Sequence, residues 1–146
     1  MKKYELTDET IDVSGTTLHR IKALKDFGNV KKGELGGYVE SERNLSQEGN
    51  CWVCGNAKVC GDAEVCGNAK VCGDADYIII KGLGSKYRNT TIFRTKENIA
   101  VKCGCFYGTL AEFVDKVKET HGNSKFAKEY LALIDLVKIH FELEDK

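Results

Sequence analysis

The chain has 146 residues but no proline, one tryptophan, one methionine and no net charge. Without proline, its turns must be made by glycine, asparagine and aspartate, which accept left-handed backbone angles. Equal numbers of basic and acidic residues, 22 of each, argue against a bulk attraction to nucleic acid or to a membrane surface. A run of about 18 apolar residues is also missing, so we expect no membrane-spanning helix.

An export signal is absent as well. The first residues, from Met1 to Leu6, lead into polar and acidic positions instead of an apolar core, so no signal peptide is predicted and a cytoplasmic location is expected. The seven cysteines are an odd number, which together with this location favours reduced thiols over a disulfide framework.

A six-residue repeat occupies the middle of the chain and reads GNCWVC, GNAKVC, GDAEVC, GNAKVC and GDADYI, starting at Gly49. An α-helix would spread such positions around its surface, whereas strands with a turn every six residues keep them on one face. A hexapeptide period is typical of β-helices. The repeat therefore predicts a short left-handed β-helix of about two coils, which needs caps at both ends.

This register separates inward from outward side chains. The residues predicted to point inward are Val53, Val59, Val65 and Val71, with the small residues Cys51, Ala57, Ala63, Ala69 and Ala75. The residues predicted to point outward are Cys54, Cys60, Cys66 and Cys72. Their C-x5-C spacing does not suit one tetrahedral zinc ion, so neither a metal nor a cofactor is predicted. Cys54 and Cys72 should stack about one strand spacing apart, ~4.8 Å, and a redox role for them or for Cys103 and Cys105 stays open.

The flanking segments predict the caps. Alternating residues over 18–24 predict a strand of the N-terminal cap. After the repeat, strands are predicted over 77–80, 90–95 and 99–103, with a turn at 96–98. A capping box from Thr109 to Glu112 predicts a helix that stops at Gly122, and a second helix follows from Ser124. The fold class is thus mainly β with a C-terminal α+β part: a β-helix domain, 1–76, capped by a βββαα module, 77–146.

The glycine-rich loop after the repeat is the predicted ligand site. Between Tyr77 and Gly108, six basic residues stand against one acidic residue, Glu97. Glycines let backbone N–H groups approach an anion, arginines can grip phosphate, and aromatic rings can stack on a base. The predicted ligand-binding residues are Lys81, Gly84, Ser85, Lys86, Tyr87, Arg88, Thr90, Thr91, Phe93 and Arg94. The alternative is a solvated hairpin whose charges are balanced by acids elsewhere.

Two resemblances follow from these motifs. The segments Gly36-Gly37-Tyr38-Val39 and 45–53 resemble the opening segment of bacterial hexapeptide transferases. Nearly the whole chain resembles a family of small hexapeptide-repeat proteins of unknown function from phages and prophages. The motifs that carry this second resemblance are the repeat, Gly82-x-Gly84-Ser85-x-x-Arg88-x-Thr90-Thr91, Cys103-Gly104-Cys105-Phe106-x-Gly108-Thr109-Leu110 and Thr120-His121-Gly122.

Three functions are compatible with the sequence. The preferred hypothesis is a non-enzymatic phage accessory protein that counters host defence in the host cytoplasm by binding a phosphate-containing small molecule, such as a nucleotide signal. The alternative is an interaction module that inhibits or scaffolds an acidic protein partner, such as a host defence protein. The third is an acyltransferase-like enzyme, disfavoured because the repeat contains none of the three histidines, so no catalytic residue is predicted. Self-association into a dimer or trimer is also expected.

Overall fold

A long hairpin begins the chain in the computed structural model, which describes residues 2–96 and 98–143. Strands β1 (Tyr4–Val13) and β2 (Thr16–Ala23) pair antiparallel through a two-residue turn in which Ser14 and Gly15 have φ angles of 52° and 87°. Such left-handed turns match the twist of paired strands. Strand β2 also pairs with β3 (Leu35–Val39), which places β3 beside the repeat.

The predicted left-handed β-helix is wrong. Each hexad supplies at most a two-residue strand: β4 (Trp52–Val53), β5 (Lys58–Val59) and β6 (Lys70–Val71). Strands β4 and β6 form a separate two-stranded parallel sheet, whereas β5 joins a mixed sheet of order β1-β2-β3-β5. No continuous solenoid therefore runs through the described residues, because the hexads are few and the N-terminal hairpin draws β3 and β5 into its own sheet.

The side chains inside the repeat nevertheless follow the sequence pattern closely. The four valines predicted to be inward are at most 1% exposed, and four of the five small residues are buried as well. Ala75 is the exception and is exposed, because it lies in the short 3-10 helix η2 (Asp74–Asp76) through which the chain leaves the repeat. The repeat therefore has the predicted dry interior without the predicted solenoid.

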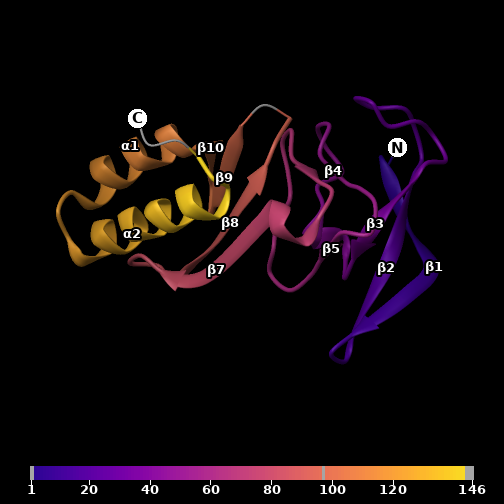
Figure 1. The fold of residues 1–146 in the computed structure, drawn as a ribbon, viewed down its shortest axis with the longest axis horizontal. Helices are drawn as coiled ribbons and strands as arrows, with labels where there is room; N and C mark the ends of the chain where they lie inside the picture. The colour runs from indigo at the N-terminus through magenta and orange to yellow at the C-terminus, as the bar shows by residue number, and fades with distance from the viewer. Residues whose placement is uncertain (1, 97, 144–146) are drawn as a thin grey trace.

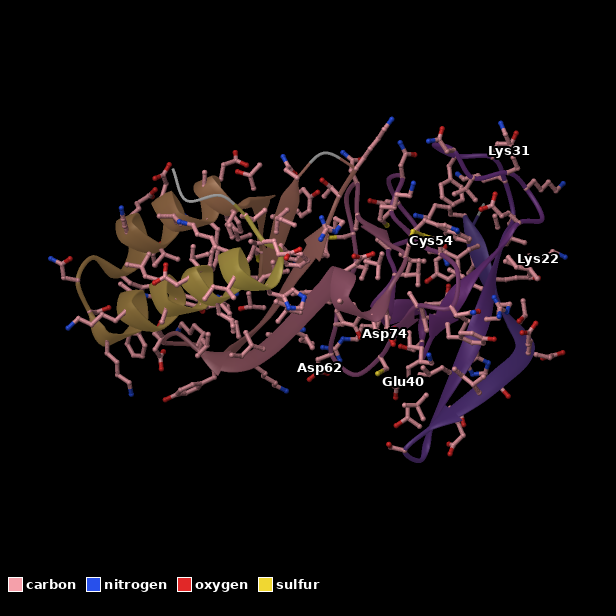
Figure 2. All side chains as sticks on the ribbon, in the orientation of Figure 1. Lys22, Lys31, Glu40, Cys54, Asp62 and Asp74 are labelled. Carbon is pink, nitrogen blue, oxygen red and sulfur yellow. A yellow bond between two sulfur atoms is a disulfide. The ribbon has the colours of Figure 1, made fainter. Side chains whose placement is uncertain are left out.

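Two repeat cysteines are joined, which corrects the expectation of reduced thiols. Cys54 and Cys72 form a disulfide with their Cα atoms 4.5 Å apart, close to the stacking distance expected from the sequence. The five remaining cysteines are free. Figure 2 places Cys54 in the middle of the molecule, between the N-terminal sheet and the C-terminal part.

The C-terminal part has one strand more than predicted. Four antiparallel strands form a sheet of order β10-β9-β8-β7, with bounds β7 (Tyr77–Leu83), β8 (Arg88–Arg94), β9 (Ile99–Cys103) and β10 (Phe106–Thr109). Helices α1 (Leu110–His121) and α2 (Lys125–His140) lie side by side on one face of it, at the end of the molecule opposite the hairpin (Figure 1). The predicted capping box is confirmed, since Thr109 accepts from the backbone of Glu112 and Glu112 accepts from that of Thr109.

Two buried apolar clusters stabilise the chain. One fills the hairpin and the repeat, and it also includes Phe93 and Ala100 from the C-terminal sheet. The other lies between that sheet and the two helices. The boundary at residue 76 stays a prediction, as does the turn at 96–98, whose Glu97 lies outside the described residues. Within 2–96 and 98–143, neither helix is long and apolar enough to cross a membrane.

Candidate functional site: a cationic pocket beside helix α1

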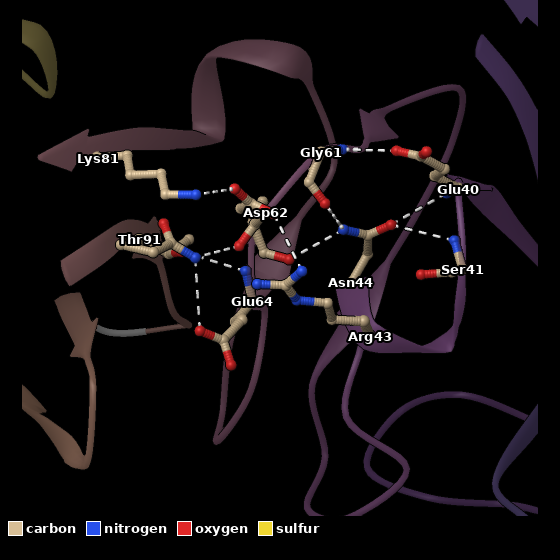
Figure 3. Close-up of polar contacts among 11 residues, drawn as sticks. Glu40, Ser41, Arg43, Asn44, Gly61, Asp62, Glu64, Lys81 and Thr91 are labelled. Atoms are coloured by element: carbon tan, nitrogen blue, oxygen red, sulfur yellow. Dashed lines mark hydrogen bonds and ion pairs between the residues drawn. The ribbon is translucent and has the colours of Figure 1, made fainter. Parts of the chain in front are cut away.

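The outer charges of the predicted site are occupied by ion pairs. Lys81 binds Asp62 with a 3.1 Å contact, and Arg43 reaches the same carboxylate at 3.0 Å (Figure 3). At the other end of the segment, Arg94 pairs with Asp76 at 3.2 Å and lies over the Phe141 ring. Lys81 therefore connects the C-terminal part to the repeat, and Arg94 connects β8 to the turn that leaves the repeat and to the residue after helix α2.

The polar residues of β8 are used in packing. Thr91 is fully buried, and its hydroxyl accepts from the backbone N–H of Glu64 at 3.1 Å (Figure 3). Thr90 is fully buried too and donates to the sulfur of Cys103 at 3.3 Å. Phe93 is wholly inside the N-terminal cluster. None of the three presents its side chain to solvent in the described structure.

Some residues at the tip of the loop line a cavity, and others do not. The backbone N–H of Gly84 donates to the carboxylate of Glu129 at 3.1 Å. This N–H was predicted to approach a bound anion, but in the structure its partner is a side chain of the protein. Tyr87 is 69% exposed and is not among the residues that line the neighbouring cavity. Ser85, Lys86 and Arg88, in contrast, line one cavity of about 290 Å³. We call this cavity the cationic pocket.

Three motifs that are separated in the sequence meet in the cationic pocket. The loop and the start of β8 supply three residues, and the β9–β10 hairpin supplies three more. Helix α1 supplies five residues between Phe113 and His121, and α2 supplies one. The remaining lining residues are Cys103, Cys105, Phe106, Phe113, Lys116, Val117, Thr120, His121 and Tyr130. The structure therefore joins segments that the sequence showed only as separate motifs.

The charged side chains that line the pocket are all basic. Lys86, Arg88 and Lys116 line it, and none of its lining residues within 2–96 and 98–143 is acidic. Lys116 has a loose 3.9 Å contact with Glu119 on its own helix, while within the described residues neither Lys86 nor Arg88 forms an ion pair. Because the whole chain is neutral, this local excess of positive charge favours an anionic ligand.

The floor of the pocket is aromatic and anchored. Tyr130 is 4% exposed, its ring meets Phe113 edge-on at 5.4 Å, and it stacks on the imidazole of His121 at 5.9 Å. Its hydroxyl donates to the carbonyl of Leu83 at 3.2 Å and lies 3.8 Å from the sulfur of Cys103. Burial is the largest of several causes that raise the pKa of this phenol. The imidazole of His121 therefore packs against this aromatic floor.

The two thiols of the pocket differ in exposure. Cys103 is 8% exposed and has two polar contacts, so it belongs to the packing. Cys105 is an exposed free thiol in the turn that follows β9, next to Gly104, whose φ is 59°. Cys105 and His121 thus place a nucleophile and a titratable base on the walls of the same cavity.

The other two histidines are held elsewhere. A ring nitrogen of His19 lies 3.2 Å from the carbonyl of Thr7, and one of His140 lies 2.8 Å from the carbonyl of Ala75. The sequence predicted no site role for His121, Lys116 or Tyr130. The one signal in the sequence was that Cys105 and His121 both belong to motifs that adjoin the first predicted helix.

A second, larger cleft lies between the repeat and the C-terminal sheet. It has a volume of about 780 Å³, and its walls include Trp52, both disulfide cysteines and Tyr107. Its charged lining residues are balanced, being Glu34, Lys70, Lys96 and Glu112. It lacks both a histidine and a free thiol among its lining residues. The cationic pocket is therefore the better candidate for nucleophilic chemistry.

Comparison with known proteins gives one partial similarity. The chain is 39% identical over 61 residues to a protein of Escherichia coli (strain K12) named Uncharacterized acetyltransferase YdcK, a match that covers 36% of this chain and 19% of that protein. The chain therefore spans about a fifth of the length of this relative. No family model matches the chain. This similarity supports a hexapeptide transferase-like relationship, while the predicted phage origin stays a prediction.

Proposed function

We propose that this protein is a small acyltransferase that works in the cationic pocket, with Cys105 as the acyl-accepting nucleophile and His121 as the general base. The observation that carries the proposal is the convergence of an exposed thiol, an imidazole and unpaired cations on one aromatic-floored cavity. The partial similarity to a protein named as an acetyltransferase supports it.

The first half-reaction loads the protein. His121 takes the proton of the Cys105 thiol, and the sulfur attacks the carbonyl carbon of an acyl thioester. The carbon–sulfur bond of the donor breaks, the donor thiolate leaves with the proton from His121, and the acyl group stays on Cys105 as a new thioester. Arg88 and Lys86 hold the phosphate groups of the donor at the rim, where no carboxylate competes for them.

The second half-reaction releases the acyl group. An amine or hydroxyl of the acceptor loses its proton to His121 and attacks the same carbonyl carbon, which restores the thiol when the bond to sulfur breaks. The cavity of about 290 Å³ is near the lower end of small-molecule sites. It therefore suits the reacting end of a donor, with the rest of the donor lying outside.

Mass spectrometry of the intact protein after exposure to acetyl-CoA tests the proposal. We expect one acetyl group on Cys105, lost in Cys105→Ser and retained in the matched control Cys60→Ser, which alters a half-buried thiol of the repeat. His121→Gln should slow the loading about 100-fold, as removal of a general base does. Arg88→Met should weaken donor binding with little change in the maximal rate. An unlabelled Cys105, or labelling that ignores His121→Gln, would refute the proposal.

A second candidate function rests on the cations alone. In this case the protein binds a small phosphate-bearing molecule without reacting with it, using Lys86, Arg88 and Lys116. The absence of acidic lining residues favours this reading. A thermal-shift panel of linear and cyclic nucleotides would test it: stabilisation that is lost in Arg88→Ala, without acetylation of Cys105, would favour binding over catalysis.

A further inference from the structure

The disulfide Cys54–Cys72 stands in the wall of the larger cleft, away from the cationic pocket. It joins the residue that follows β4 to the residue that follows β6, 18 residues later. Both sulfur-bearing residues line the cleft. Cys72 is exposed and Cys54 is half-buried, so a small thiol can reach the bond from the cleft.

The backbone keeps the two cysteines together whether or not they are bonded. In β4 and β6, Trp52 pairs with Lys70 and Val53 with Val71. The backbone N–H of Cys54 donates to the carbonyl of Val71 at 2.8 Å, and that of Trp52 donates to the carbonyl of Ala69 at 3.0 Å. Reduction therefore leaves the sulfurs adjacent, which favours reoxidation to the same pair over exchange with distant thiols.

The other repeat thiols are poor competitors. Burial raises the pKa of Cys66 to about 11, and burial together with nearby carboxylates raises the pKa of Cys60. Thiols with raised pKa values contain little thiolate, which is the form that attacks a disulfide. Cys51, the remaining free thiol of the repeat, is fully buried, and burial raises its pKa as well. The exposed Cys72 and its partner Cys54 are therefore the repeat cysteines best placed for exchange.

We propose that Cys54–Cys72 is a site of reversible thiol–disulfide exchange with small thiols or dithiols, and that its state controls the rigidity of the larger cleft. A thiolate attacks the sulfur of exposed Cys72, the sulfur–sulfur bond breaks, and Cys54 leaves as a thiolate and takes up a proton. A second thiol resolves the mixed disulfide on Cys72. In sum, two thiols are oxidised to one disulfide while Cys54 and Cys72 are reduced to thiols.

The cleft changes because the bond ties its two strands together. Asn50 and Trp52 from the β4 segment line the cleft, as do Asn68 and Lys70 from the β6 segment, and the pairing of β4 with β6 makes them parts of one wall. With the bond intact, β4 and β6 move as one wall. Without it, the two strands stay paired through their backbone hydrogen bonds, but the covalent link at their ends is lost, so the segments at Cys54 and Cys72 can fluctuate more. The inference does not depend on acyl transfer, because Cys105 is not involved.

Trp52 gives a direct readout, since it is the only tryptophan in the chain and lies two residues from Cys54. The full chain is equilibrated in dithiothreitol buffers of graded oxidised-to-reduced ratio, alkylated and analysed by mass. We expect Cys54 and Cys72 to become alkylated together in one two-electron step, with a parallel rise in Trp52 emission and faster hydrogen exchange at 50–54 and 68–72.

Variants distinguish a disulfide whose redox state changes the cleft from one that serves only as a permanent cross-link. The Cys54→Ser/Cys72→Ser double variant should behave as the reduced protein in every buffer, whereas Cys60→Ser should keep the full response. Reoxidation should restore the original emission and exchange. Free thiols at both positions under every oxidising ratio would overturn the proposal. So would a reduced protein whose Trp52 emission and hydrogen exchange equal those of the oxidised form.

Discussion

The guanidinium of Arg88 lies over the α-carbon of Gly104, so closely that a methyl group on Gly104 would overlap its Nη1 atom. Gly104 also has a left-handed backbone, with a φ of 59°. The glycine of the turn that carries Cys105 therefore provides the space in which a cation of the loop sits. This contact connects two of the motifs that line the cationic pocket.

Gly104→Ala should displace Arg88 and weaken the binding of a phosphate-bearing acyl donor about tenfold or more, the usual effect of losing a charge-assisted hydrogen bond. Isothermal titration calorimetry with acetyl-CoA measures the loss. Gly61→Ala is the control, because Gly61 has a φ of 66° and open space around it. Equal affinity in the two variants would show that Arg88 does not depend on this contact.

Tyr130→Phe should lower the free energy of unfolding by about 1–2 kcal/mol, because the carbonyl of Leu83 loses its donor inside the pocket floor. Urea titration followed by circular dichroism gives the difference. The same oxygen deletion in Tyr87→Phe should change stability by less than about 0.5 kcal/mol, since that side chain is 69% exposed. Similar losses in both variants would contradict the role assigned to the Tyr130 hydroxyl.

Asn44→Ala should destabilise the repeat by about 3 kcal/mol or more. The Asn44 side chain is fully buried; it donates to the carbonyls of Gly61 and Ala63, and it accepts from the backbone N–H groups of Glu40 and Ser41 (Figure 3). Its removal would leave four backbone groups without that partner. Thermal unfolding by calorimetry measures the effect.

Asp62→Ala provides the contrast to Asn44→Ala. Asp62 pairs with both Arg43 and Lys81, yet these contacts are exposed to solvent and screened by salt. We therefore expect a much smaller change in melting temperature, and one that shrinks further as salt is added. If Asp62→Ala proved as damaging as Asn44→Ala, surface charge would matter more here than buried hydrogen bonding.

Tyr77 should make stability fall at alkaline pH. Burial raises the pKa of its phenol from 10.0 to about 12, and its hydroxyl donates to the carbonyl of Lys58 at 2.9 Å. Because the folded state holds this proton more tightly than the unfolded state, the contribution is complete below pH 10.0 and is lost as pH rises toward about 12. Urea titrations across this range should show a steeper decline in the parent than in Tyr77→Phe. Parallel declines would exclude this contribution.

Local signals predicted the C-terminal elements well. The capping box at Thr109 and the serine at position 124 mark the starts of the two helices correctly, because caps depend on residues within one turn. Strand β1 was missed, since its residues are largely polar and it is stabilised by pairing with β2. Strand β10 was missed because it has four residues, one of them glycine, at a sheet edge.

The candidate site was only partly predictable because it depends on contacts between residues that are far apart in the sequence. Ser85, Lys86 and Arg88 were expected to bind a ligand, and whether they do stays a prediction. Local composition could not reveal that Lys81 and Arg94 are paired with acids of the repeat and its exit turn, since those acids lie 18 or more residues away. The directions of α1 and α2, which bring Lys116 and Tyr130 to the pocket, depend on how the helices pack.

Strand β10 separates the two cavities, because alternate side chains of a strand point to opposite faces. Phe106 lines the cationic pocket, whereas Tyr107 lines the larger cleft. Inserting one residue between Cys105 and Phe106 would exchange these two rings, and would shift the start of α1 with its capping box. A change in the length of this segment would therefore alter both cavities at once, whereas a substitution of Phe106 or of Tyr107 would alter the lining of one cavity only.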